Sequence, residues 1–217
     1  MPLRRAQPWL PALLAAALAV LYLLWDPPAP DLAAQVFRTD LFAHDGFALW
    51  NGQWFGGHHT LGYSVLFPPL AAALGPELVG GLAAVASAVL FDRIVRHHWG
   101  DDAWVGSLWF AASTATNLLI GRLTFTLGVA VGLAAVLALQ RDRRGLALGL
   151  AAVCSLSSPV AGLFLGLVGA SLALAGRPRS GVELAVAAVA PAALLSLAFP
   201  DTGHQTFDFM TLWPVLV

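Results

Sequence analysis

Groups that could perform acid–base or phosphate chemistry are concentrated between Asp31 and Tyr63. This segment holds three carboxylates, three histidines and one arginine: Asp31, Asp40, Asp45, His44, His58, His59 and Arg38. A carboxylate can take a proton from a hydroxyl group or orient it, and arginine is the preferred side chain for holding a phosphate. Because mostly apolar sequence lies on both sides, we expect this segment to carry the chemistry of the protein.

The composition predicts an integral membrane protein. Of the 217 residues, 59% are hydrophobic and 11% are charged, whereas about a quarter of the residues in a soluble domain are charged. So few charges could not cover the surface of a soluble domain of this length. The net charge of −1 gives no indication of nucleic-acid binding, and the single cysteine, Cys154, excludes an internal disulfide.

Apolar runs separated by short polar turns predict an all-α, polytopic transmembrane helix bundle of about seven spans. The first run is long enough to span and lacks a clear cleavage site, so we interpret it as a retained helix and not as a signal peptide. Asp92–His98 is expected to be a loop. The run 145–176 is too long for one span and is interpreted as two short helices turning at Ser155–Pro159. The expected spans are 8–25, 76–91, two within 103–140 that turn at 117–122, two within 145–176, and 182–199.

The arginines orient this bundle through the positive-inside rule. Only Arg38 and Arg122 fall at the outer ends of the expected helices. The other nine of the eleven basic residues fall at the opposite ends: Arg4, Arg5, Arg93, Arg96, Arg141, Arg143, Arg144, Arg177 and Arg179. We therefore expect a cytoplasmic N-terminus in a multi-pass protein of a bacterial plasma membrane.

The same orientation predicts a large outer loop at 26–74 and a second at 200–213, within a single domain 1–217. This domain stops where an eighth helix would begin, which is typical of a fragment of a longer chain or of a minimal module. In the first loop, Asp31 follows three prolines and suits the N-cap of a short interfacial helix. Asp31, Gln35 and Arg38 would share one face of it. A second short helix is expected within 63–74.

Small motifs follow one another in a distinctive order along this loop. They are Asp31-Leu32-x-x-Gln35, Leu49-Trp50-Asn51-Gly52-Gln53-Trp54, Gly56-Gly57-His58, Gly62-Tyr63 and Phe67-Pro68-Pro69-Leu70. This order resembles the GT-C superfamily of membrane glycosyltransferases, which use polyprenyl-phosphate sugars. The resemblance covers residues 25–75 by motif and the rest by topology only. It implies transfer of a hexose or pentose from a polyprenyl-phosphate donor at the non-cytoplasmic face, with Asp31 as the carboxylate that activates the acceptor.

For such a reaction, other polar residues would bind substrate. Arg122, the lone charge between two outer helix ends, would hold the departing phosphate. The acceptor could be a glycan, a lipid or a protein. A divalent metal could join His58 and His59 with nearby carboxylates, but adjacent histidines usually diverge, so we assign no metal ligands. The remaining candidates are Gln35, Arg38, His44, Asp45, Trp54, His58, His59 and Tyr63.

Each feature also has a purely structural interpretation. Asp31 could simply cap a helix, Arg122 could snorkel or pair with Asp31 or Asp45, and tryptophans could anchor in the interface. Two other functions are therefore kept open. In a secondary transporter or channel the outer loop would be a gate, although the spans lack buried acids and no repeat is visible. The third function is a non-catalytic membrane scaffold.

Overall fold

The computed structural model describes residues 9–53 and 57–200 and is all-α, as predicted. The helices are α2 (Leu10–Trp25), α3 (Leu32–Asp45), α4 (Phe67–Leu74), α5 (Pro76–Trp99), α6 (Trp104–Ile120), α7 (Leu123–Gln140), α8 (Arg144–Ser157), α9 (Pro159–Leu174) and α10 (Pro178–Ala198). Two short 3-10 turns, η2 (Thr60–Gly62) and η3 (Gly100–Ala103), join them. A two-stranded hairpin pairs β1 (Trp50–Asn51) with β2 (His58–His59). The predicted second outer loop at 200–213 lies, beyond Pro200, outside the described residues.

Three helical segments of the described chain are long and apolar enough to cross a membrane. They are Pro76–Ile120, which contains α5 and α6, Leu123–Gln140 and Pro178–Ala198. The helices α2, α8 and α9 are apolar but shorter. Large hydrophobic side chains lie on the outside of the bundle, as Leu24 and Leu197 do at 81% exposure each. A surface of this kind fits a lipid environment. The total of seven spans remains a prediction.

Two predicted helix breaks are confirmed. The turn between α6 and α7 lies at Gly121–Arg122, and α8 ends at Ser157 directly before α9 begins at Pro159. Pro159 ends α8 because proline disfavours helical geometry in the residue before it, and it then starts α9 because it needs no hydrogen-bond acceptor in the first turn.

The predicted loop at Asp92–His98 is wrong, because α5 continues to Trp99. Asp92 is only 5% exposed and accepts two bonds of 2.8 Å from Nε of Arg96, one turn later. The charges that indicated a loop therefore stabilise the last turns of the helix as an i, i+4 pair. Gly100, with a φ of +58°, then ends it.

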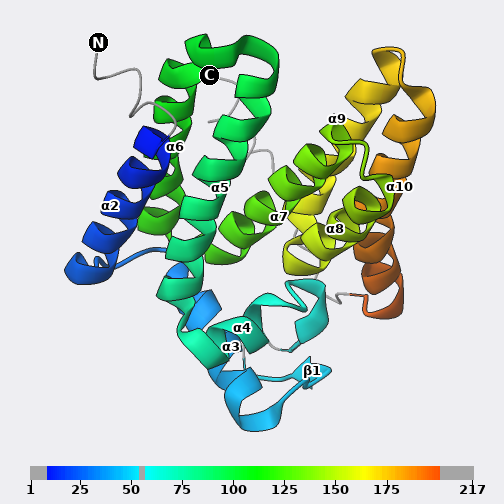
Figure 1. The fold of residues 1–217 in the computed structure, drawn as a ribbon. Coiled ribbons are helices and arrows are strands. Elements are labelled where there is room, and N and C mark those ends of the chain that lie inside the picture. The colour runs from blue at the N-terminus through cyan, green and yellow to red at the C-terminus, as the bar shows by residue number, and fades with distance from the viewer. Residues whose placement is uncertain (1–8, 54–56, 201–217) are drawn as a thin grey trace, which may run out of the picture.

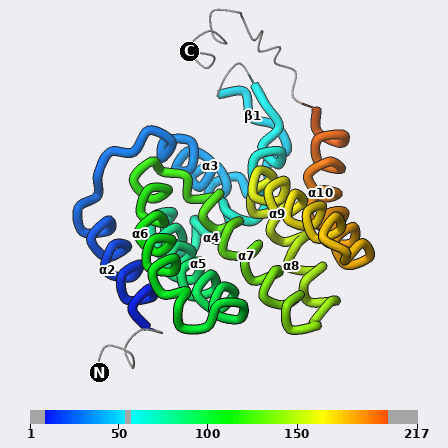
Figure 2. Tube along the Cα trace, turned by 90° about the horizontal axis from the view of Figure 1, so that it is seen from above, coloured from blue at the N-terminus to red at the C-terminus, as the bar shows by residue number. Residues whose placement is uncertain are grey.

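The long helices form two groups that meet mainly along α5 and α7. In the first group, α2, α5 and α6 pack together; in the second, α7 packs on α8, and α8 and α10 both pack on α9 (Figure 1). The contact between α5 and α7 joins the groups, as Figure 2 shows from above. Leu118 and Leu123, both at most 1% exposed, belong to the core cluster on the α5 side. The turn between α6 and α7 is therefore held firmly.

The two ends of the bundle differ in character. At one end, called here the Asp31 end, lie α3, α4 and the hairpin (Figure 1). There the backbone N–H of Asp31 donates to the carbonyl of Ile120 at 2.9 Å, and that of Val65 donates to Leu156 at 2.9 Å. At the opposite, arginine end, His98 contacts Gln140 at 2.9 Å and Arg144 pairs with Glu183. The described part of the 26–74 segment is thus bonded to the turns at the Asp31 end.

Gly121 should be the least replaceable glycine of the Asp31 end. It has a φ of +85°, and an added Cβ would lie 2.5 Å from the backbone nitrogen of Leu32. Gly121→Ala should lower the free energy of unfolding by about 2–5 kcal/mol, through strain and overlap together. Thermal unfolding of the detergent-solubilised protein measures this.

Two control variants separate backbone strain from the overlap with Leu32. Gly176, at the end of α9, has a φ of +90° with open space around its Cβ position, and like Gly121 it is followed by an N–H that bonds to the carbonyl five residues earlier. Gly176→Ala therefore reports backbone strain alone, about 1–2 kcal/mol. Gly149 lies inside α8 with open space and an ordinary φ, so Gly149→Ala should stabilise by about 0.5–1 kcal/mol. Equal losses at Gly121 and Gly176 would mean that the overlap with Leu32 does not matter.

Candidate functional site

A cavity of about 460 Å³ opens at the Asp31 end. This volume lies in the usual range for small-molecule sites, about 300–1,000 Å³. Three of the predicted site residues, Asp31, Tyr63 and Arg122, line it together. The complete lining is Asp31, Gly62, Tyr63, Arg122, Thr124, Phe125, Ser158, Pro159, Val160 and Phe164.

Asp31 and Arg122 form an ion pair in this cavity. Nε of Arg122 lies 3.1 Å from Oδ2 of Asp31, and the two side chains are 58% and 46% exposed. Asp31 is the N-cap residue of α3, as predicted, but its carboxylate makes no capping bond and turns to Arg122. The carboxylate and the guanidinium therefore remain accessible to a ligand.

Three helices begin at the cavity. Asp31 is the N-cap of α3, Arg122 of α7 and Ser158 of α9, and all three line it. The N-terminus of a helix carries a partial positive charge, roughly +0.5 of an elementary charge, and its first N–H groups lack partners within the helix. Because three such ends and one guanidinium meet a single carboxylate, the cavity favours an anion.

The remaining wall is hydrocarbon. Phe125 of α7 and Phe164 of α9 meet edge to face, with ring centroids 6.1 Å apart. Phe164 also lines a second, apolar cavity of about 140 Å³ between the same two helices, bordered by Gly128 and Gly132. An added Cβ on Gly128 would lie 2.5 Å from Cβ of Ala161, so this close approach of α7 and α9 requires glycine there. The cavity at Asp31 is therefore followed, beyond Phe164, by a second, apolar cavity that lies along α7 and α9.

Tyr63 reaches the cavity from a segment that is fixed on both sides. Nε2 of Gln35 donates to its hydroxyl at 2.6 Å, and the guanidinium carbon of Arg38 lies 3.9 Å from the centre of its ring. The next residue, Ser64, donates through Oγ to the carbonyl of Ser157 at 2.7 Å. The predicted common face of Asp31, Gln35 and Arg38 is thus realised. Asp31 lines the cavity, and the other two hold Tyr63 from behind.

The other candidates lie elsewhere. His44 and Asp45 are exposed at the far end of α3, where Nδ1 of His44 lies 2.8 Å from the backbone carbonyl of Asp40. His58 and His59 form β2; His59 packs edge-on against Trp50 and lies 3.2 Å from the carbonyl of Pro200. None of these residues lines the cavity. Trp54 is outside the described residues.

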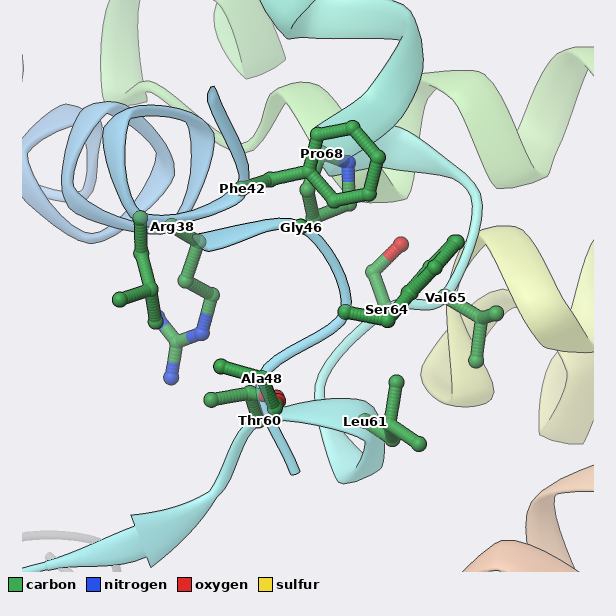
Figure 3. A pocket seen from close by; sticks show the side chains of 11 residues that line it. Arg38, Phe42, Gly46, Ala48, Thr60, Leu61, Ser64, Val65 and Pro68 are labelled. Atoms are coloured by element: carbon green, nitrogen blue, oxygen red, sulfur yellow. The ribbon is translucent and has the colours of Figure 1, made fainter. Parts of the chain in front are cut away.

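No group of three or more metal-ligating side chains occurs among residues 9–53 and 57–200. A third, much smaller cavity lies beneath α3, between Arg38, Phe42 and Pro68 (Figure 3). Its volume of about 20 Å³ accommodates about one water molecule and no larger ligand. Of these features, only the cavity at Asp31 combines charge with room for a substrate.

Sequence reasoning missed seven of the ten lining residues. Apart from Gly62, they belong to the first turns of α7 and α9 or to the N-cap of α9, and these helix starts were interpreted only as turns: Thr124, Phe125, Ser158, Pro159, Val160 and Phe164. A signal was available in the predicted topology, which put the turns at 117–122 and 155–159 on the same side. First-turn residues beyond two such turns can share one site, because each helix start presents free N–H groups.

No protein-family model, no curated protein and no solved structure matches this chain. A function is therefore inferred from the cavity and its residues.

The ion pair in the cavity should contribute little to stability. Both side chains are about half exposed and Asp31 makes no capping bond, so Asp31→Ala should cost less than about 1 kcal/mol of unfolding free energy. Asp92→Ala is the matched control, because Asp92 is buried beside Arg96. Its removal should cost more, about 1–3 kcal/mol, although Asp101 still pairs with Arg96 at 3.0 Å. Thermal unfolding measures both, and a loss at Asp31 as large as that at Asp92 would make the pair a structural element.

Proposed function

We propose that this chain is a GT-C-like membrane glycosyltransferase, or the membrane module of one. It would transfer a sugar from a polyprenyl-phosphate donor to an acceptor hydroxyl, with Asp31 as the activating carboxylate. The observation that carries this proposal is the cavity in which Asp31 and Arg122 lie 3.1 Å apart against a hydrocarbon wall. A donor of this class has an anionic phosphate, a sugar and an apolar tail, and the cavity offers a complementary environment for each.

Arg122 and the helix starts would bind the phosphate. The contact with Asp31 uses Nε of Arg122, so the terminal Nη groups can form further bonds to phosphate oxygens. The N-termini of α7 and α9 add partial positive charge. The apolar tail would leave the head-group cavity past Phe164 and lie along α7 and α9, where the second cavity begins.

The reaction would break one bond and form another at the anomeric carbon. The acceptor hydroxyl attacks this carbon while Asp31 takes its proton. The bond from the anomeric carbon to the phosphate oxygen breaks, and the electron pair leaves with the polyprenyl phosphate. Arg122 and the helix N-termini stabilise the negative charge that develops there. Because Arg122 pairs with Asp31 before the ligand arrives, a bound phosphate would compete for the guanidinium and release the carboxylate of Asp31 for the acceptor hydroxyl.

This proposal includes a membrane topology of seven spans, α2 and α5 to α10, with the Asp31 end outside. The distribution of arginines supports it, since nine of the eleven belong to the other end of the predicted layout. The short helices α8 and α9 are compatible with it because their break is packed inside the protein, with Ser157 at 1% and Ser158 at 4% exposure. The 26–74 segment would then cover the outer mouth of the bundle.

A transporter and a scaffold are the rival functions. A transport pathway usually carries ionisable groups near the middle of the membrane, and the charged residues that line the cavity, Asp31 and Arg122, both lie at helix starts. A scaffold would not require an accessible carboxylate beside a guanidinium. The glycosyltransferase is therefore favoured, and both rivals become outcomes of the following test.

Asp31→Asn should abolish most of the transfer. With purified protein in lipid vesicles, polyprenyl-phosphate sugars and a panel of acceptors, the substitution should lower the turnover rate by about 10²- to 10⁴-fold, because it removes the base. Binding of polyprenyl phosphate should persist. Arg141→Gln, at the arginine end, is the control and should leave both unchanged. Transfer at the wild-type rate by Asp31→Asn would exclude the proposed role, and solute uptake by the same vesicles would favour the transporter.

Chemical labelling of introduced cysteines tests the proposed orientation of the protein in the membrane. A cysteine introduced at the exposed Gln53 should react with a membrane-impermeant maleimide in intact cells, whereas one at the exposed Asp142 should react only after the membrane is opened. The native Cys154 is 0% exposed and gives little background. In intact cells, labelling at position 142 alone would mean that the topology is inverted and that Asp31 lies on the cytoplasmic side. Labelling at both positions would contradict the proposed topology.

A further inference from the structure

The side-chain amide of Gln35 is buried and only partly satisfied. Gln35 is 1% exposed, and its Nε2 donates to the hydroxyl of Tyr63 at 2.6 Å. Its Oε1 is buried and meets no hydrogen-bond donor in the described part of the chain. The amide therefore buries one unpaired polar atom.

Such an arrangement lowers stability. A buried amide atom without a partner loses its bonds to water and gains none in exchange. A leucine at position 35 would occupy similar space without that loss. Strained or unsatisfied groups of this kind concentrate at functional sites, where they are kept for what they do to a ligand. The amide of Gln35 is connected to such a site through Tyr63, its hydrogen-bond partner, which lines the Asp31 cavity.

Tyr63 has one hydrogen-bonding group still to use. Its hydroxyl oxygen accepts from Gln35, so the hydroxyl proton can be donated elsewhere. Arg38 covers the ring at 3.9 Å, and the backbone that follows is fixed by bonds from Val65 and Leu66 to the carbonyl of Leu156 at 2.9 and 3.2 Å. The phenol is therefore held from α3 and from the α8–α9 break, the elements that also supply Asp31 and Ser158 to the cavity.

We propose that Tyr63 binds the ligand of this cavity by donating its hydroxyl proton to an oxygen of the head group, and that Gln35 is the positioning residue that directs it. The identity of the ligand, a prenyl phosphate or its sugar ester, rests on the function proposed above. The oxygen that accepts belongs either to the phosphate or to the sugar. Tyr63 contributes to affinity and to selection of the head group, while proton removal from the acceptor stays with Asp31.

The test measures binding and stability together on the full chain in detergent. The probes are farnesyl phosphate and a set of its hexosyl and pentosyl esters. Tyr63→Phe removes only the hydroxyl, and Gln35→Leu removes the amide that orients it. Each should weaken binding by about threefold to tenfold, the usual effect of one hydrogen bond. The double variant should bind no more weakly than either single variant, because both changes act through one hydroxyl.

Thermal stability separates positioning from mere packing. Gln35→Leu should leave the unfolding midpoint unchanged or raise it, because it removes the unpaired atom. Thr39→Val is the matched control on the same buried side of α3, where the Thr39 hydroxyl donates to the carbonyl of Gln35 at 2.8 Å. It should leave binding unchanged. A lower midpoint with unchanged binding in Gln35→Leu would overturn the proposal, and so would wild-type binding by Tyr63→Phe.

The pattern across probes identifies the accepting oxygen. Weaker binding of all probes by Tyr63→Phe indicates a phosphate oxygen, and weaker binding of the esters alone indicates a sugar oxygen; either result supports the proposal. Arg122→Gln distinguishes it from the proposed function. If Arg122→Gln loses binding while Tyr63→Phe and Gln35→Leu do not, only the role of Tyr63 is lost. A wild-type protein that binds none of the probes overturns both.

Discussion

The cavity depends on the tight turn between α8 and α9, which is packed inside the Asp31 end of an apolar bundle. Between α8 and α9 the backbone leaves helical geometry at Ser158, and carbonyls at such a break need donors where water is scarce. Residues 64–66 supply them: the N–H groups of Val65 and Leu66 bond to Leu156, and the hydroxyl of Ser64 bonds to Ser157. The need to satisfy the last carbonyls of α8 thus determines where the segment that carries Tyr63 must lie.

A second attachment completes the wall from the other side. The N–H of Asp31 bonds to Ile120, and Leu32 packs so closely on Gly121 that no Cβ fits between them. The start of α3 is thereby fixed to the start of α7. Since α9 starts at the break described above, three helix N-termini come together around one carboxylate and one guanidinium. The electrostatic character of the site follows from backbone connections as much as from charged side chains.

Sequence patterns predicted the helices well because hydrophobic length is a strong signal in this chain. The breaks near Gly121 and Ser158 were found from short polar interruptions in apolar runs. The prediction of a loop at Asp92–His98 was wrong because charged residues were taken to end the helix. An i, i+4 ion pair in which the acid is buried instead lets the helix continue through Asp92 and Arg96. Asp31 and Arg122 were both singled out from sequence, and Asp31 and Asp45 were both considered as partners of Arg122. Only the tertiary packing decides for Asp31, 91 residues away along the chain. Phe125 and Phe164 look like ordinary lipid-facing residues until their helices are placed side by side.

The share of the site that is built from main chain has an evolutionary consequence. A mutation can change a side chain, but the partial positive charge at the starts of α7 and α9 persists under almost any substitution that keeps those helices starting where they do. Selection for anion binding would therefore act on residues that set the starting points, such as Gly121 and Pro159, more than on the residues nearest the ligand. Side chains around the mouth would be free to diverge and so to adapt one scaffold to new head groups.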